Sequence, residues 1–305
     1  MVEHDFDTGV EQAASAFPSP DELWERCRAR KGLTPLAENL LRFPFERTLR
    51  NPDGSVKEPR YYQRVAIQRA LAAIADGRKR ILLTMATGTG KTFTAMQIIW
   101  KLWQSEWQGG RKPRFLYLAD RNILVDQPIA REFKPVFGGA VWKVQGTVCT
   151  GRELYFALYQ ALADTSDALG IFRDYPPDYV DLIVVDECHR GSARDESSRH
   201  EILEHFAPAA QLGMTATPKR DDNIDTYRYF GNPIHQYSLA QGIDDGFLAP
   251  YRVRRVVLSP DAFGWAPEAV EVDRFGRDIP PGSTPPRVLS GSCRCSRGRR
   301  PSRSI

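Results

Sequence analysis

A short glycine-rich sequence between a strand and a helix constrains the fold of this chain more than any other feature. The sequence is Thr87–Thr92 (TGTGKT), and it closely follows the apolar run Ile81–Met85, which is typical of a buried strand. Apolar residues then recur at helical spacing from Ala95 to Trp103. Glycines let a tight turn point its N–H groups at an anion, and a helix N-terminus adds a favourable dipole. We therefore expect a phosphate-binding loop on a parallel α/β sheet.

The side chains of this loop predict how a nucleotide and its metal ion are held. Lys91 is placed to reach the β- and γ-phosphates, and the Thr92 hydroxyl to coordinate Mg²⁺. The strict phosphate-loop pattern has a further glycine where this chain has Met85, a departure that fits the helicase variant of the loop. The alternative is a glycine turn with a chance Lys-Thr, which the flanking strand and helix disfavour. The residues predicted to bind ATP are Gln63, Thr87, Gly88, Thr89, Gly90, Lys91 and Thr92.

Two carboxylates follow a second apolar strand, predicted over 182–185. The carboxyl ends of parallel strands line the ligand crevice of an open sheet. Asp186 is therefore expected to hold Mg²⁺ together with Thr92, and Glu187 to orient and polarise an attacking water. With Lys91, these two carboxylates are the residues predicted to act on ATP. Taken alone, the pair also fits an acidic strand end beside a surface histidine.

Two weaker patterns gain their value from their order along the chain. Thr215-Ala216-Thr217-Pro218 follows a strand predicted over 211–215, and its hydroxyls, with His189, are candidates for coupling the phosphate site to a moving partner domain. A capped turn explains the same residues locally. Upstream of the loop, the amide of Gln63 offers a donor and an acceptor that match an adenine edge. A helix start with packed tyrosines explains that segment equally well.

Strand and helix patterns alternate along most of the chain, as a parallel sheet requires. Further strands are predicted over 115–118 and, as an edge or departing strand, over 251–258. A helix is predicted to begin at Asp21, with Ser19-Pro20 as its cap and first turn, and a turn at Asn51–Gly54. The predicted fold is α/β: a RecA-like parallel sheet with helices on both faces. We expect a lead-in over 1–56, the nucleotide-binding lobe over 57–258, a connection over 259–282 and an Arg/Ser-rich tail over 283–305.

Bulk charge does not indicate the partner of this chain. Of its 42 basic residues, six lie in the tail, which has no acid, and the other 36 are matched by 38 acidic residues. DNA binding must therefore be argued from motifs. The five cysteines are scattered and odd in number, Cys293-x-Cys295 is too short to be a zinc site, and neither a long apolar run nor a secretory signal is present. These features favour a cytoplasmic protein that does not enter a membrane.

The ordered set of motifs resembles the DEAD/DEAH-like helicases and translocases. Three stretches narrow the resemblance to the R subunit of type I restriction enzymes, and they are 115–127 (FLYLADRNILVDQ), 186–192 (DECHRGS) and 229–251. The resemblance covers residues 18–281, and it implies an ATP-driven motor lobe that pulls duplex DNA. It also implies methyltransferase and specificity subunits as partners. DNA contact is expected along 119–127 and 146–160, with Arg121 and Gln127 as candidate residues.

Two departures from that family limit what the resemblance implies. Its nuclease normally precedes the motor, whereas here only about 56 residues do, and the sole Glu-x-Lys, Glu132-Phe133-Lys134, is expected as a surface coincidence on a helix. The second motor lobe, with the arginines that complete the ATP site, is also missing, so we expect a truncated fragment. An RNA or repair helicase, or a truncated chain that only binds a nucleotide or a partner, remains an alternative. The tail fits either disorder or a shifted reading frame.

Overall fold

The computed structural model describes residues 2–4, 11–13, 16–105, 107–163, 170–188, 193–216, 224–250, 271–272 and 278–279. Two compact units are present, Met1–Ala249 and Pro250–Ile305. In the second unit the described part is an antiparallel pair, β10 (Glu271–Val272) with β11 (Asp278–Ile279). The strand expected over 251–258 and the tail over 283–305 lie outside the described residues.

The first unit is built on one seven-stranded sheet in which every neighbouring pair is parallel. The strand order is β5-β6-β4-β7-β8-β3-β9. The strands are β3 (Arg80–Met85), β4 (Phe115–Ala119), β5 (Val141–Lys143), β6 (Leu154–Leu158), β7 (Leu182–Asp186), β8 (Ala210–Thr215) and β9 (His235–Tyr237). The strands predicted over 81–85, 115–118, 182–185 and 211–215 are confirmed to within one residue at each end. The sequence patterns did not predict β5, β6 and β9.

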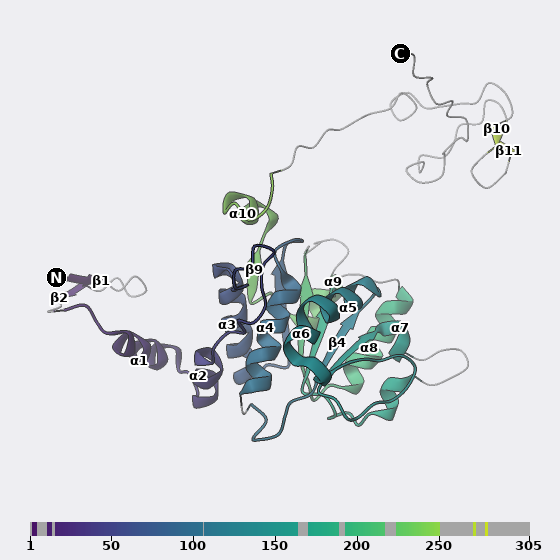
Figure 1. Ribbon diagram of the computed structural model, residues 1–305, viewed down its shortest axis with the longest axis horizontal. Coiled ribbons are helices and arrows are strands. Elements are labelled where there is room, and N and C mark those ends of the chain that lie inside the picture. The colour runs from purple at the N-terminus through teal and green to yellow at the C-terminus, as the bar shows by residue number, and fades with distance from the viewer. Residues whose placement is uncertain are drawn as a thin grey trace, which may run out of the picture. The chain divides into compact units, whose positions relative to one another are not determined.

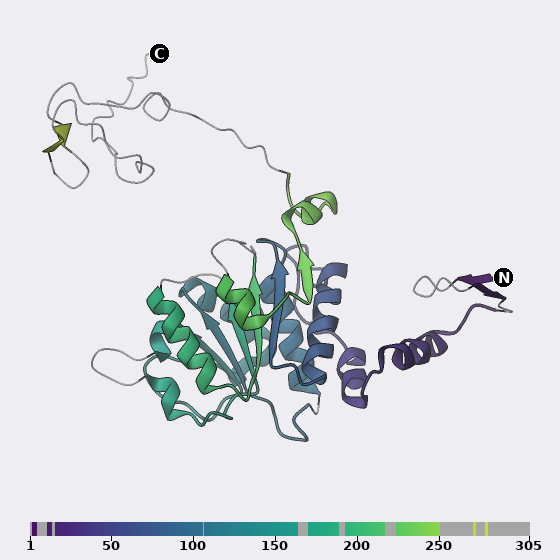
Figure 2. The same cartoon turned by 180° about the vertical axis from the view of Figure 1, so that it is seen from behind.

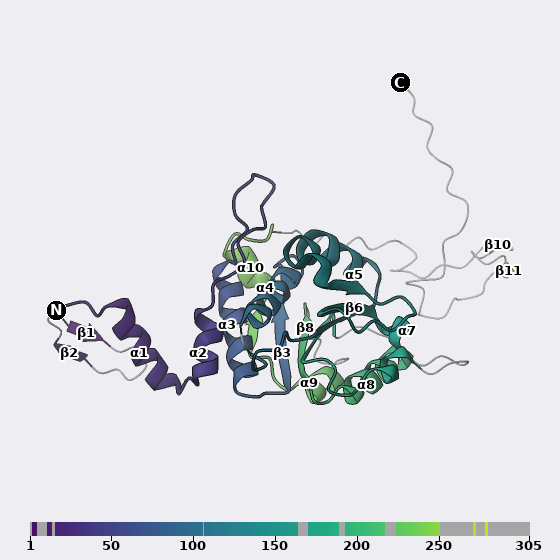
Figure 3. The same ribbon diagram turned by 60° about the horizontal axis from the view of Figure 1, so that its bottom comes forward.

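Helices cover both faces of this sheet, as predicted, and Figure 3 shows them on its two sides. One face carries α3 (Tyr61–Ala75), α4 (Lys91–Gln104), α5 (Ile123–Pro128), the π-helical turn Ile129–Phe133, α6 (Lys134–Phe137) and the 3₁₀ turn Gly138–Ala140. The other face, turned toward the viewer in Figure 2, carries α7 (Tyr159–Leu162), the 3₁₀ turn Ile171–Asp174, α8 (Ala193–His205) and α9 (Ile224–Phe230). None of the helices in the described part of the chain combines the length and apolar composition needed to cross a membrane.

The sheet separates two hydrophobic cores, because successive side chains of a strand point to opposite faces. On β7, Val184 packs into the core under α3 and α4, while Ile183 and Val185 pack into the core under α7 and α8. All five residues of β7 are buried. A strand covered on both faces has no solvent side, and its sequence is therefore continuously apolar until Asp186.

Two helices and an extended strap precede the sheet. Helix α1 (Pro20–Lys31) begins where the sequence predicts, with Ser19 and Glu22 forming a capping box. Helix α2 (Pro35–Arg42) follows, and the Trp24 indole donates a hydrogen bond to Glu38 (2.9 Å). Upstream, β1 (Val2–His4) and β2 (Glu11–Ala13) form a short antiparallel pair. The predicted turn is confirmed, since Gly54 has φ +83° and donates a backbone hydrogen bond to Asn51.

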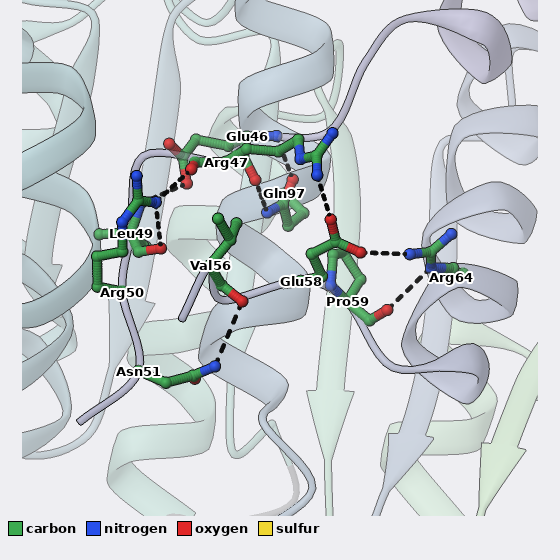
Figure 4. Close-up of polar contacts among 10 residues, drawn as sticks. All are labelled: Glu46, Arg47, Leu49, Arg50, Asn51, Val56, Glu58, Pro59, Arg64 and Gln97. Carbon is green, nitrogen blue, oxygen red and sulfur yellow. Dashed lines mark hydrogen bonds and ion pairs between the residues drawn. The ribbon is translucent and has the colours of Figure 1, made fainter. Parts of the chain in front are cut away.

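The strap over residues 43–59 is fastened to helix α4, as Figure 4 shows. The side-chain amide of Gln97 donates to the backbone carbonyl of Glu46 (3.0 Å) and accepts from its backbone N–H (2.9 Å). One turn later, the buried Lys101 ammonium donates to the carbonyls of Leu40 and Leu41 at the end of α2. Helix α4 begins at the predicted phosphate-binding loop, so the strap is attached to the element that starts at the candidate site (Figure 1).

Candidate nucleotide-binding site

The predicted phosphate-binding loop joins β3 to α4, and its glycines adopt the conformation that such a loop needs. Gly88 and Gly90 have φ of +84° and +81°, in the left-handed region that favours glycine. Thr89 is folded into the loop, and its hydroxyl donates to the Ala86 carbonyl (2.6 Å). Helix α4 starts at Lys91 with Gly90 as its N-cap. The loop and the helix N-terminus therefore have the backbone geometry that the predicted anion cradle needs, and phosphate binding stays a prediction.

Two side chains from the start of α3 brace the loop. The Tyr62 hydroxyl (3.0 Å) and the Gln63 amide (2.8 Å) both donate hydrogen bonds to the Thr89 carbonyl. Gln63 is buried, and its amide oxygen accepts from the Arg60 backbone N–H (2.9 Å). A Cβ on Gly90 would clash with the Gln63 amide nitrogen, and the positive φ of Gly90 also favours glycine there. The structure thus gives Gln63 a bracing role, while its contact with an adenine stays a prediction.

Asp186 lies buried at the end of β7, where the sequence expects a metal ligand. Its carboxylate accepts a hydrogen bond from the Tyr117 hydroxyl (2.7 Å) on one oxygen and from the Glu187 backbone N–H (3.0 Å) on the other. Burial raises the pKa of Asp186, the Tyr117 hydrogen bond lowers it, and the charge of Glu187 raises it further. A carboxylate in such a dry site gains from a nearby cation when it is ionised.

Glu187 has a backbone conformation that is unusual for its residue type. Its φ is +49°, and it is the one non-glycine residue with positive φ among those the structure describes. Such a conformation costs of order 1–3 kcal/mol and is commonly stored at functional sites. The turn brings the carboxylate toward the loop, where its Oε1 lies 3.2 Å from the Lys91 Nζ, and both side chains are only about a tenth exposed. The structure therefore brings together Lys91 and Glu187, which are distant in sequence, and their action on ATP stays a prediction.

The residues at this site fit Mg²⁺ bound with a nucleotide. Thr92 at the start of α4 and Asp186 at the end of β7 would offer oxygen ligands, the kind that Mg²⁺ prefers. Within the described ranges no cluster of three or more His, Cys, Asp or Glu residues could hold a metal ion. A site with few protein ligands suits Mg²⁺, which keeps waters and phosphate oxygens in its coordination shell.

The structure describes only part of the predicted coupling residues. Thr215 ends β8, which lies between β7 and β3, so its buried side chain stands between the carboxylates and the loop. His189 and Thr217 lie outside the described residues. The coupling role of His189, Thr215 and Thr217 stays a prediction.

The predicted DNA-contact segments involve two neighbouring strands, β4 and β6, but 146–153 precede β6, so only the end of the second segment lies at the carboxyl end of its strand. Residues 119–127 follow β4, and 146–160 include β6, with which β4 pairs in parallel register. Arg121 is largely exposed, with its guanidinium 3.6 Å from Asp120, and Gln127 is exposed on α5. The structure thus leaves both side chains accessible. Contact with DNA stays a prediction.

Sequence reasoning missed the position of Glu132 and the role of Tyr117. Glu132 is not a surface residue, because its side chain is 15% exposed and forms an ion pair with Lys57 (2.8 Å). It lies in the π-helical turn on one face of the sheet and not on a strand. Tyr117 looks like an ordinary strand residue in sequence. A hydroxyl within an otherwise apolar strand was the available signal.

A parallel sheet with a glycine loop after β3, a lysine at the start of the next helix and paired carboxylates after β7 defines a P-loop NTPase lobe of the RecA-like type. Among known protein families, the model for the res subunit of type III restriction enzymes matches residues 56–220. The chain belongs to this family of helicase-like restriction-enzyme subunits.

Relatives narrow the likeness to type I restriction enzymes, as the sequence motifs indicate. The EcoAI endonuclease subunit of Escherichia coli is 48% identical over 264 residues, which cover 86% of this chain and 31% of that protein. The EcoKI endonuclease subunit of E. coli K12 is 33% identical over 222 residues, covering 65% of this chain and 18% of that protein. An HsdR subunit fragment from Vibrio vulnificus YJ016 superposes with a TM-score of 0.66 at 48% identity, covering 82% of this chain and 42% of that one. The chain thus spans less than a third of the length of either curated relative.

Proposed function

We propose that this chain is the ATP- and Mg²⁺-binding motor lobe of a DNA translocase, the restriction subunit of a type I restriction-modification system. The observation that carries the proposal is the meeting of Lys91 with Glu187, beside Asp186, at the mouth of a glycine loop. A strand-end turn of ordinary structural purpose does not need a strained glutamate aimed at a lysine. The relatives, which are named as type I endonuclease subunits, support the same assignment.

The side chains divide the chemistry between them. Backbone N–H groups of the loop and the Lys91 ammonium would bind the phosphates, while Thr92 and Asp186 would hold the metal ion. When bound, Mg²⁺ neutralises charge that develops on the phosphate oxygens. Lys91 exchanges its contact with Glu187 for the phosphates, and the Glu187 carboxylate then accepts a hydrogen bond from the attacking water.

The wider assembly is part of this proposal. Double-stranded DNA would run past Arg121 and Gln127, and methyltransferase and specificity subunits would complete the complex in the cytoplasm. Residues 57–258 would form the lobe, with 1–56 leading into it, 259–282 leaving it and 283–305 as a tail. Coupling to a further lobe would pass through His189, Thr215 and Thr217.

The proposal is tested by binding of a fluorescent ATP analogue to the 305-residue chain. Lys91→Ala should weaken binding at least roughly tenfold, because a charge contact with the phosphates is lost. Glu187→Gln should bind at least as well as the unmodified chain, because Asp186 still holds the metal ion. Lys134→Ala, at an exposed lysine of α6, is the matched control and should bind normally. Equal binding by Lys91→Ala and the unmodified chain would remove the nucleotide site.

A further inference from the structure

A buried tyrosine contacts one of the two expected metal ligands. Tyr117 is 1% exposed, and its hydroxyl donates a hydrogen bond to Asp186 Oδ2 (2.7 Å). This hydroxyl therefore contacts a side chain that is expected to present oxygens to Mg²⁺.

The sheet register explains how Tyr117 reaches this position. Tyr117 of β4 is paired with Val184 of the adjacent β7, and Asp186 is two residues further along on the same face. The tyrosine side chain is long enough to span those two residues along the strand direction. A phenylalanine would match its shape but would have no hydroxyl to donate. A hydroxyl at this one position can meet the carboxylate at the strand end.

Packing holds the tyrosine ring in place. It is stacked on Phe156 of β6, with ring centroids 5.1 Å apart and an interplanar angle of 25°, and it meets Phe133 edge-on at 5.9 Å. These contacts belong to the core under α3 and α4, so the ring has little freedom to swing away from Asp186. A fixed ring gives its hydroxyl a fixed direction.

We propose that Tyr117 is a positioning residue of the metal site, holding the Asp186 carboxylate in the orientation that Mg²⁺ requires. The inference rests on the proposed nucleotide-binding function. Tyr117 is not itself proposed to touch nucleotide or metal, and its effect passes through Asp186. With one Asp186 oxygen occupied by the tyrosine, the carboxylate is oriented before the metal ion arrives. Groups that orient metal ligands in this way typically change metal affinity by roughly 10–100-fold when removed.

The test is a Mg²⁺ titration of fluorescent ATP analogue binding to the 305-residue chain. Tyr117→Phe keeps the ring and removes the hydroxyl. We expect it to need roughly tenfold more Mg²⁺ for half-maximal enhancement of binding, with binding in EDTA unchanged. Tyr179→Phe is the matched control, because it also removes a buried hydroxyl, one that donates to the Thr150 carbonyl (2.9 Å) in the other core. Its Mg²⁺ curve should superpose on that of the unmodified chain.

The outcomes separate this inference from the proposed function. A Tyr117→Phe curve equal to that of the unmodified chain would overturn the positioning role, while the nucleotide site would stand. Equal weakening in EDTA and in Mg²⁺ would also overturn it, because a general loss of structure acts on both. If the unmodified chain itself binds no nucleotide, or gains nothing from Mg²⁺, the proposed function fails and the inference falls with it.

Discussion

Glu187 shows at the residue scale how a site can oppose local preference. The left-handed backbone at φ +49° disfavours any residue with a Cβ, yet a glutamate occupies it and directs its carboxylate to Lys91. The neighbouring Cys188 is fully buried, and burial raises the pKa of its thiol to about 12. A neutral thiol at that position adds no charge to a site that already holds two carboxylates.

The strain at Glu187 predicts that Glu187→Gly is more stable than Glu187→Ala, although glycine is usually the more destabilising of the two substitutions. Glu187→Ala and Glu187→Gly both remove the ion pair with Lys91, so they differ only in the backbone preference of the new residue. Glycine adopts a positive φ without steric cost. For alanine the same backbone conformation costs about 1–2 kcal/mol. Urea unfolding should therefore find Glu187→Gly the more stable variant by about 1 kcal/mol. A more stable alanine variant would show that the left-handed turn is absent in solution.

His235 predicts a loss of stability in acid. Burial, followed by the charge of Arg69, lowers its pKa from 6.5 to about 4. Between these values the unfolded chain binds a proton that the folded chain does not, so the stabilisation is complete above pH 6.5 and is lost as the pH falls toward 4. The loss attributable to His235 is at most roughly 3 kcal/mol. Urea unfolding of His235→Phe should show a shallower fall over this range, and parallel curves for the two proteins would contradict the assignment.

At the element scale, helix α4 carries both the start of the nucleotide site and the fastening of the strap. Lys91 and Thr92 form its first turn, while Gln97 and Lys101 hold residues that precede the sheet. Burial lowers the pKa of Lys101 to about 8, so its charge is held at a cost that the hydrogen-bonded carbonyls of α2 partly offset. One rigid helix thus links the lead-in to the phosphate-binding loop.

Gln97 and Glu58 predict a contrast between buried and exposed contacts of the strap, both drawn in Figure 4. Gln97→Ala leaves a buried N–H and a buried carbonyl of Glu46 without their partner, and we expect a loss of about 2–3 kcal/mol in unfolding free energy. Glu58→Ala removes ion pairs with the exposed Arg47 and Arg64, and we expect a loss below about 1 kcal/mol. Thermal or urea unfolding measures the loss of unfolding free energy in each variant. Equal losses in Gln97→Ala and Glu58→Ala would mean that the buried Gln97 contacts do not hold the strap.

At the scale of the whole molecule, the predicted nucleotide site is formed by one lobe. In motors of this kind an arginine from a second lobe stabilises the transition state, and such a residue is worth roughly 10³–10⁵ in rate. This chain spans 31% of its E. coli EcoAI relative, which leaves most of that protein's length unmatched. A variant or condition that preserves ATP binding is therefore not expected to give comparable ATP hydrolysis.

The 305-residue chain is expected to bind ATP and hydrolyse it only slowly, with little stimulation by long duplex DNA. The measurement is the steady-state ATPase rate with no nucleic acid, with duplex DNA and with RNA. Robust DNA-stimulated turnover that disappears in Glu187→Gln would show that one chain of this length holds a complete motor. Stimulation by RNA alone would favour an RNA helicase over a DNA translocase.

The local elements of the site were predictable from sequence because their signals lie within a few residues of one another. A strand, a glycine loop and an amphipathic helix are encoded by period and turn chemistry over 80–104, and the carboxylates by the end of an apolar run. The three strands of the seven-stranded sheet that were not predicted have weaker signals. β5 and β9 have three residues each, too few to show a period, and β6 lies in a stretch without clear strand boundaries.

The sequence by itself therefore determined the α/β class, the loop and the identity of the charged residues around it. Only the tertiary structure decided that β8 lies between β3 and β7, which sets the spacing at which Lys91 meets Glu187. It also decided that Gln63 braces the loop and that Tyr117 reaches Asp186. Local chemistry specifies a turn or a helix start, whereas strand order and the partners of a buried hydroxyl depend on how distant segments share one core.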